Sequence, residues 1–172
     1  MSGVYMISAT PTTTFLPVVA ENIPEELKAR RQWVCWRLEE RDEKLTKVPY
    51  VAGAARRASS TDPMTWRTFA EALAAYEVGE PPYDGIGFVF SPEDPFVGID
   101  IDGCRDPETG EITDEQAQEI ISSVGEGYIE VSPSGKGIHI ILEGVVRGGG
   151  MRRGKVEMYA RDRYFTVSGQ VL

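Results

Sequence analysis

The sequence has little cysteine, a single histidine and no long apolar run. Its 172 residues include only two cysteines, Cys35 and Cys104, which form neither a disulfide framework nor the spacing of a cysteine metal site. We expect two free thiols in a reducing cytoplasm. The longest apolar runs are far shorter than the roughly 20 residues that a membrane-spanning helix requires. The first twenty residues lack the basic start and the unbroken apolar middle of a signal peptide. The sequence therefore predicts a cytoplasmic protein without a membrane segment.

The composition is that of a folded domain. Hydrophobic residues make up 41% of the chain and charged residues 26%, which excludes disordered and membrane classes. The length suffices for one domain with a sizeable core. We expect a flexible tail over residues 1–20 and a single domain over residues 21–172.

The net charge of -9 is unevenly distributed along the chain. Residues 83–130 contain thirteen acidic residues and one basic residue. Residues 144–172 contain two acidic residues and six basic ones, namely Arg147, Arg152, Arg153, Lys155, Arg161 and Arg163. The overall charge therefore does not exclude a nucleic-acid partner. The basic segment fits either a solvated hairpin or a phosphate-binding surface.

The first half of the chain predicts two helices among strands. The stretch "NIPEELKARRQ" indicates a short helix, and "WVCWRL" and "KLTKVPY" indicate a hairpin. Asp62 and Pro63 have the pattern of a helix start, and apolar residues then recur at steps of three and four up to Gly79. The stretches "IGFVF" and "FVGIDID" follow as strands.

The second half predicts one helix and more strands. Thr113 and Gln116 fit a capping box, and Gly125 fits the end of the helix that follows. The stretches "YIEVS", "GIHIIL", "KVEMYA" and "RYFTVSG" read as strands. The order of elements predicts an α+β fold with a mostly antiparallel sheet.

Strand alternation predicts a polar cluster on one sheet face. In "VGIDID", Asp100 and Asp102 share a face and the isoleucines share the other. Alternation likewise puts Glu157 and His139 opposite the apolar residues of their strands. Each residue alone also has a simpler interpretation, as a solvent-facing acid or a structural histidine. If the strands are neighbours, four ionisable groups converge, and a divalent cation would offset the repulsion between the carboxylates.

The segment "SPSGKGIH" combines hydroxyls, glycines and a lysine between two strands. Ser132, Ser134 and Lys136 could bind a phosphate group, although a tight hairpin would use the same glycines. The segment "GGMRRGK" has the glycine and lysine spacing of a phosphate-binding loop of Walker type. However, Val156 follows the lysine where Ser or Thr is needed, and a strand follows instead of a helix.

Taken in order, "GIDID", "SPSGKGIH" and "VEMYARDRYFTVSG" resemble the three motifs of the archaeo-eukaryotic primase superfamily. The resemblance is to the primase-polymerase branch found in phages, plasmids and other mobile elements. The stretches "WVCWRLEERDEKLTKVPY" and "ASSTDPMTWRTFAEAL" resemble the beginning of those proteins. The likeness covers residues 22–170.

The resemblance implies a fold and a set of site residues. The expected fold is a mostly antiparallel sheet of RNA-recognition-motif type packed beside a smaller α/β unit, with the active cleft between them. The catalytic ligands of Mg²⁺ or Mn²⁺ would be Asp100, Asp102 and Glu157. The residues that bind the nucleotide triphosphate would be Ser132, Ser134, Lys136 and His139.

The implied activity is template-directed addition of nucleotides to a primer 3′-hydroxyl by two-metal catalysis. The expected partners are a DNA template and primer, nucleoside triphosphates and a replicative helicase domain or protein. The residues expected to contact nucleic acid are Arg152, Arg153, Lys155, Arg161 and Arg163. The aromatic residues Tyr159, Tyr164 and Phe165 could stack on bases or pack in the core. Because strand initiation in this family commonly needs further helical segments or a fused helicase, we favour primer extension over priming.

Two other classes of function compete with this interpretation. A replication-initiator module that binds single-stranded DNA without catalysis could use a similar sheet, but it would be expected to lack one or more of the three acids. A metal-dependent nuclease also uses clustered carboxylates, but hydrolysis does not require a site for a triphosphate.

Overall fold

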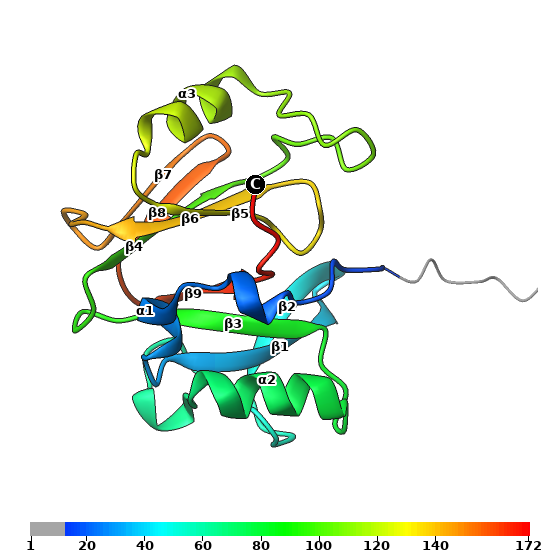
Figure 1. Cartoon of the computed structure of the whole chain (residues 1–172). Coiled ribbons are helices and arrows are strands. Elements are labelled where there is room, and N and C mark those ends of the chain that lie inside the picture. The colour runs from blue at the N-terminus through cyan, green and yellow to red at the C-terminus, as the bar shows by residue number, and fades with distance from the viewer. Residues whose placement is uncertain (1–12) are drawn as a thin grey trace, which may run out of the picture.

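The computed structural model describes residues 13–172, which form two antiparallel sheets stacked one above the other (Figure 1). The first sheet has the strand order β2-β1-β3-β9. Its strands are β1 (Trp33–Arg41), β2 (Lys44–Tyr50), β3 (Gly85–Phe90) and β9 (Arg163–Val167). The predicted hairpin of the first two strands is confirmed, with Arg41 paired to Lys44 at its tip.

The second sheet has five strands in the order β5-β6-β4-β8-β7. They are β4 (Phe96–Ile101), β5 (Tyr128–Val131), β6 (Ile138–Glu143), β7 (Gly150–Arg153) and β8 (Val156–Tyr159). Strand β7 was not predicted, because its glycine and arginine residues carry no apolar alternation. The α+β class and the antiparallel pairing are confirmed. The finer expectation of a sheet of RNA-recognition-motif type stays a prediction.

Each sheet has a helix on one face (Figure 1). Helix α2 (Phe69–Val78) packs on the four-stranded sheet, and α3 (Glu115–Ser123) packs on the five-stranded sheet. The short elements are α1 (Glu25–Lys28) and the 3₁₀ turns η1 (Ala20–Asn22) and η2 (Pro63–Thr65). The isoleucine faces of β4 and β6 pack against the apolar residues of α3.

The predicted start of the second helix was wrong. The Asp62 side chain accepts a hydrogen bond from the Met64 amide, but the turn that it caps ends at Thr65. Helix α2 begins after Thr68, which forms a reciprocal capping box with Glu71. A capping box satisfies two free amides at the helix start, whereas Asp62 satisfies one. The predicted end of this helix at Gly79, which has a left-handed backbone, is confirmed.

The start of α3 also differs from the predicted capping box. Asp114 caps the helix, and its carboxylate accepts from the Ala117 amide at 3.0 Å. The Thr113 hydroxyl instead donates to the Cys104 carbonyl at 3.3 Å. The predicted stop is confirmed, because Gly125 directly after the helix has a φ of 57°.

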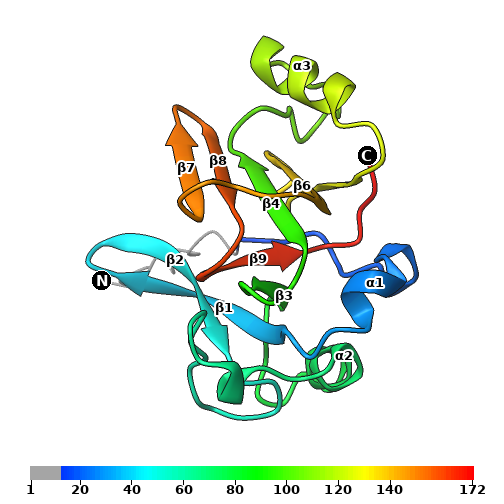
Figure 2. The ribbon, with the colours of Figure 1, turned by 90° about the vertical axis from the view of Figure 1, so that its left-hand side faces the viewer.

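The polar face of the five-stranded sheet turns toward the four-stranded sheet. In the views of Figures 1 and 2, β9 lies between β3 and the five-stranded sheet. A Cβ atom on Gly98 of β4 would lie only 2.5 Å from Phe90 Cζ and 2.6 Å from Phe165 Cε2. The absence of a side chain at Gly98 therefore allows β4 to approach the phenylalanines of the other sheet.

The first twelve residues of the predicted tail lie outside the described residues. The tail's later part contacts both sheets. The Leu16 amide donates to the Pro133 carbonyl at 2.8 Å, and the Val19 amide donates to the Ser168 carbonyl at 2.8 Å. Phe15 packs edge-on against Trp36, with ring centroids 4.8 Å apart.

Both cysteines are free, as predicted, and both are buried. Burial raises the pKa of the Cys35 thiol to about 12, so this thiol stays protonated and packs as a small apolar group. No helix over residues 13–172 is long and apolar enough to cross a membrane.

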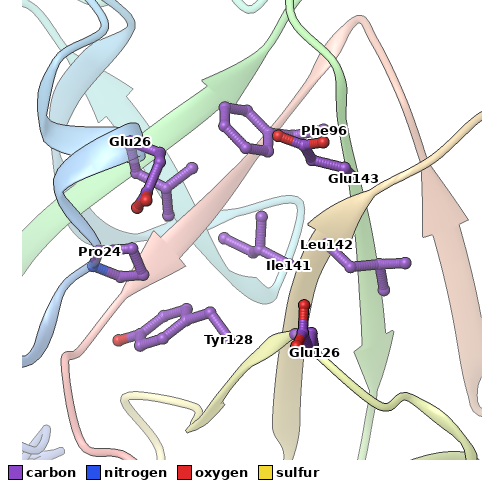
Figure 3. A pocket seen from close by; sticks show the side chains of 10 residues that line it. Pro24, Glu26, Phe96, Glu126, Tyr128, Ile141, Leu142 and Glu143 are labelled. Atoms are coloured by element: carbon purple, nitrogen blue, oxygen red, sulfur yellow. The ribbon is translucent and has the colours of Figure 1, made fainter.

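A cavity of about 750 Å³ opens beside α1 (Figure 3). Its apolar lining includes Leu27, Phe96 and Ile141, and Glu26 and Glu143 are among its acidic lining residues. Phe96 and Glu143 pair at the opposite end of β4 and β6 from Asp100. The cavity is therefore separate from the predicted carboxylate cluster.

We predict that Gly98→Ala destabilises the protein by about 1–3 kcal/mol, the usual cost of overpacking. The added methyl group would have to displace the rings of Phe90 and Phe165. The measurement is the free energy of unfolding in urea. Gly144→Ala is the matched control, because a Cβ there would have only ordinary contacts, the nearest at 3.4 Å. Equal stability of the two variants would show that the sheets do not pack tightly at Gly98.

Candidate active site

Three predicted site residues lie side by side on adjacent strands. In the register of the five-stranded sheet, Asp100 of β4 is paired with His139 of β6 on one side and with Glu157 of β8 on the other. Residues opposite one another in a sheet have Cβ atoms about 5 Å apart. The Asp100 Oδ1 atom is 3.6 Å from His139 Nε2. Three of the four groups predicted to converge are thus neighbours in the sheet.

The other acid of the first motif lies just beyond the strand. Strand β4 ends at Ile101, and the Asp102 amide donates to the Lys155 carbonyl at 3.1 Å. This bond joins the end of β4 to the turn of the β7–β8 hairpin. Asp102 is exposed, whereas the side chain of Asp100 keeps 24% of its surface exposed.

The Glu157 carboxylate contacts two neighbouring side chains. Its Oε1 atom is 3.0 Å from Arg152 Nη1, and its Oε2 atom accepts from the Tyr159 hydroxyl. The hydrogen bond to Glu157 raises the pKa of the Tyr159 hydroxyl. The Glu157 carboxylate is thus bound by two side chains of the same β7–β8 hairpin, those of Arg152 and Tyr159.

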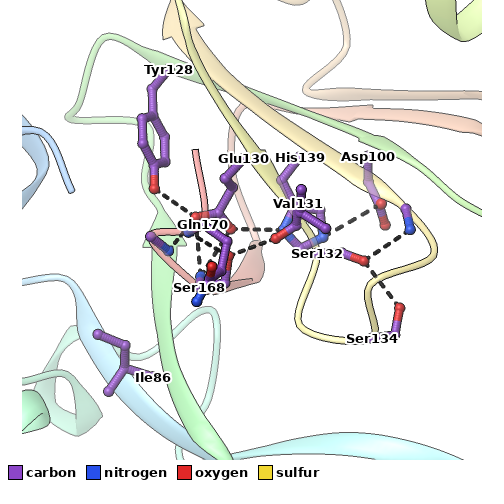
Figure 4. Close-up of polar contacts among 12 residues, drawn as sticks. Ile86, Asp100, Tyr128, Glu130, Val131, Ser132, Ser134, His139, Ser168 and Gln170 are labelled. Carbon is purple, nitrogen blue, oxygen red and sulfur yellow. Dashed lines mark hydrogen bonds and ion pairs between the residues drawn. The ribbon is translucent and has the colours of Figure 1, made fainter. Parts of the chain in front are cut away.

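A buried carboxylate holds His139 from the side away from Asp100 (Figure 4). Glu130 of β5 is fully buried, and its Oε1 atom is 3.2 Å from His139 Nδ1. An ionised carboxylate only accepts hydrogen bonds, so Nδ1 is the donor. The His139 ring also lies 5.1 Å from the Phe165 ring. Its Nε2 atom therefore faces Asp100 in a fixed orientation.

The remaining acceptor positions of Glu130 are filled by groups from other segments (Figure 4). The amides of Ser168 and Gly169, which follow β9, donate at 3.0 and 2.8 Å. The Tyr128 hydroxyl donates at 2.7 Å. Burial raises the pKa of Tyr128, and the Glu130 charge and this hydrogen bond raise it further. Glu130 thus connects the five-stranded sheet to the end of the four-stranded one.

The electrostatics around Asp100 disfavour its charge. Burial raises the pKa of Asp100, and the neighbouring charges of Asp102 and Glu157 raise it further. His139 and Lys47 act in the opposite direction but do not cancel the effect of burial. The charged form of Asp100 is thus less favoured in this site than in water.

The "SPSGKG" loop precedes β6 and is tightly folded. The Ser132 hydroxyl accepts from the Gly137 amide at 3.1 Å and lies 3.1 Å from the Ser134 hydroxyl. Ser132 is buried, whereas Ser134 and Lys136 are exposed. Arg105 donates to the Gly135 carbonyl at 2.8 Å and anchors the loop to the segment after β4. The loop therefore lies beside the end of β4, next to the carboxylates.

The predicted nucleic-acid-binding residues lie on the β7–β8 hairpin, in the turn after it and at the start of β9. Arg152 contacts Glu157, and Lys155 Nζ is 3.5 Å from Asp114 Oδ2. The guanidinium of Arg163 lies over the Tyr159 ring at 5.0 Å. Phe165 is a core residue, so packing accounts for it and base stacking does not.

Among residues 13–172, no three acidic, histidine or cysteine side chains are gathered as ready metal ligands. The carboxylates share one end of the sheet, but each side chain has a different neighbour. Asp100 faces His139, and Glu157 is bound by Arg152 and Tyr159. The oxygen-only set of carboxylates nevertheless has the chemistry that hard divalent cations prefer.

The structure adds two residues that the sequence analysis did not single out, Glu130 and Lys47. Alternation in "YIEV" puts Glu130 on the face of His139 once their strands pair, so a signal for Glu130 was present. Lys47 gave no local signal. It lies on β2 of the other sheet, and its proximity to the aspartates depends on how the two sheets stack.

No family model matches the chain. Among curated proteins, the chain is similar to the DNA primase-polymerase of Nitratiruptor phage NrS-1, with 37% identity over 147 residues. The similarity covers 81% of this chain and 19% of the phage protein. The chain thus spans about a fifth of the length of this relative.

We predict that Asp100→Asn stabilises the metal-free protein at pH 7. An acid with a raised pKa in the folded state lowers stability as the pH rises above its ordinary pKa, and the full loss is reached above its raised pKa. The stability advantage of the variant should therefore be absent near pH 4 and grow toward pH 7. The measurement is urea unfolding with a chelator across this range. Glu119→Gln, in an exposed residue of α3, should match the wild type throughout. A stability difference between Asp100→Asn and the wild type that does not change with pH would contradict a raised pKa of Asp100.

Proposed function

Because this chain is a homologue of one segment of a DNA primase-polymerase, we propose that it is a domain that transfers nucleotides from nucleoside triphosphates to a primer 3′-hydroxyl on a DNA template. The observation that carries the proposal is the alignment of Asp100, His139 and Glu157 on three adjacent strands. This arrangement combines carboxylates with a group that can bind an anion, on the sheet face that turns to the other sheet.

The proposed metal ligands are Asp100, Asp102 and Glu157. Burial and mutual repulsion raise the pKa of Asp100, so a cation bound here would relieve an existing electrostatic cost. Mg²⁺ and Mn²⁺ suit such oxygen ligands. When bound, these ions would supply the activation of the primer hydroxyl and the stabilisation of charge on the phosphates.

The proposed triphosphate site consists of His139 and the adjacent loop. Glu130 orients the His139 ring, and Nε2 faces Asp100 on the other side of that ring. Ser134 and Lys136 are exposed on the loop and can donate to phosphate oxygens. Ser132 contributes by holding the loop through its bond from the Gly137 amide.

Five basic residues are proposed to bind the phosphates of template and primer, namely Arg152, Arg153, Lys155, Arg161 and Arg163. The Arg153 side chain is exposed and has no hydrogen bond or ion pair to any described residue, so it is free to contact a phosphate. Arg152 contacts both Glu157 and solvent, and it would connect the primer to the carboxylate cluster. We further propose a role in the replication of a mobile element, because the relative is a phage protein. A helicase partner stays a prediction.

We predict that Asp100→Ala and Asp102→Ala each lower nucleotide incorporation by about 10²-fold or more, because each removes a ligand of the catalytic cations. The measurement is extension of a labelled primer on a DNA template with each nucleoside triphosphate and Mg²⁺ or Mn²⁺. The variants should remain folded, since the removed charges repel their neighbours.

Glu119→Ala is the matched control, an exposed acid on the opposite side of the five-stranded sheet. This variant should extend primers like the wild type. Full extension by a protein with both aspartates replaced would contradict the proposal. Shortening of the primer would indicate a nuclease, and DNA binding without any incorporation would indicate an initiator module.

A further inference from the structure

A row of ionisable residues crosses the whole five-stranded sheet. In the register of the strands, Glu130 of β5 is paired with His139 of β6, which is paired with Asp100 of β4. On the other side, Asp100 is paired with Glu157 of β8, and Glu157 is paired with Arg152 of β7. Side chains paired in this way lie on the same face of a sheet. Within this row, only Asp100 and Glu157 are neighbours with the same charge.

The two acids at the centre of the row contact partners on their outer sides. The Asp100 Oδ1 atom is 3.6 Å from His139 Nε2. The Glu157 Oε1 atom is 3.0 Å from Arg152 Nη1. Like charges directly opposite one another in a sheet repel, so these outward contacts reduce the repulsion between the acids. For Glu157, the same contact also competes with any cation that would bind between the two acids.

The ion pair between Arg152 and Glu157 is open to exchange. The Arg152 side chain keeps 72% of its surface exposed, and β7 is the outer strand of its sheet (Figure 2). A phosphate can therefore reach the guanidinium from solvent. An exposed ion pair contributes little to stability, and a guanidinium binds phosphate with the same two-point geometry as carboxylate. A DNA phosphate can thus replace Glu157 as the partner of Arg152.

The other oxygen of Glu157 has a partner of its own. The Tyr159 hydroxyl donates to Oε2, and the Arg163 guanidinium lies 5.0 Å from the centre of the Tyr159 ring. Loss of the Arg152 contact would free Oε1 and leave the hydrogen bond to Oε2 in place. The carboxylate would then stay oriented by Tyr159 and offer one unoccupied oxygen, the kind of ligand that Mg²⁺ and Mn²⁺ prefer.

We propose that Arg152 is a switch that couples DNA binding to metal binding. Without DNA it holds Glu157, and when a phosphate of the primer or template binds Arg152, Glu157 is released to the catalytic cation. This inference rests on the proposed function and adds regulation to its metal site. Arg152 is a positioning residue, because it acts through Glu157. Cation and DNA then strengthen each other's binding by the same factor, as thermodynamic linkage requires.

The first test is calorimetric titration of the protein without DNA with Mn²⁺. Arg152→Gln should bind Mn²⁺ more tightly by about three- to fivefold, the most that an exposed ion pair usually contributes. Arg152→Lys, which keeps the charge, should stay close to the wild type. Arg153→Gln is the matched control, because Arg153 is the next residue of β7 and has no ion pair to any described residue. Its Mn²⁺ affinity should stay within about twofold of the wild type, because salt screens an unpaired exposed charge.

The second test is the affinity for a primer-template duplex, measured with Mn²⁺ and with a chelator at equal ionic strength. Arg152→Gln and Arg153→Gln should both bind the duplex more weakly than the wild type, because each loses a proposed phosphate contact. Mn²⁺ should strengthen duplex binding of the wild type and of Arg153→Gln by about three- to fivefold relative to its effect on Arg152→Gln. This comparison removes the general effect of Mn²⁺ on DNA.

Asp100→Ala separates failure of the switch from failure of the proposed function, because it should lose Mn²⁺ binding. A wild type that binds no Mn²⁺, or binds it as well as Asp100→Ala does, would overturn the proposed metal site and the switch with it. Mn²⁺ binding that depends on Asp100 but is equal in Arg152→Gln and Arg153→Gln would overturn only the switch. Duplex binding that responds to Mn²⁺ equally in all three proteins would also overturn only the switch.

Discussion

The arrangement of the site depends on one buried carboxylate, that of Glu130. Moving a carboxylate out of water costs several kcal/mol unless hydrogen bonds replace the lost hydration. Glu130 receives them from the backbone after β9, from Tyr128 and from the His139 ring. Because the donors come from both sheets, the group is satisfied only when the sheets are correctly stacked. The same stacking orients the histidine toward Asp100.

The residues around Asp100 do not compensate its charge. Asp100 and Glu157 bring negative charge together on adjacent strands, and burial makes the charge of Asp100 still less favourable. Lys47 approaches from the opposite sheet but does not neutralise it by contact. A divalent cation bound near Asp100, as the proposed function requires, would offset this cost.

Whether a site residue could be predicted from the sequence depends on whether the rule that places it acts within one strand or helix. Side-chain alternation is local, so it placed Asp100, His139 and Glu157 on the correct faces. The start of α2 was missed because two local capping signals, at Asp62 and at Thr68, compete within a few residues. Which sheet a strand joins is not a local property, and the effect of Lys47 on the pKa of Asp100 depends on how the two sheets are arranged. No pattern within β2 could have revealed that effect.

The most direct test of the account is calorimetric titration of the wild-type protein with a nucleoside triphosphate, with Mg²⁺ and with a chelator. If carboxylates and basic groups share a metal-bound triphosphate, binding should be clearly measurable with Mg²⁺ and weaker by at least about tenfold without it. The matching nucleoside, which has no phosphates, should not bind detectably at the same concentrations. Triphosphate binding of equal strength with and without Mg²⁺, or equal binding of the nucleoside, would contradict the central claim.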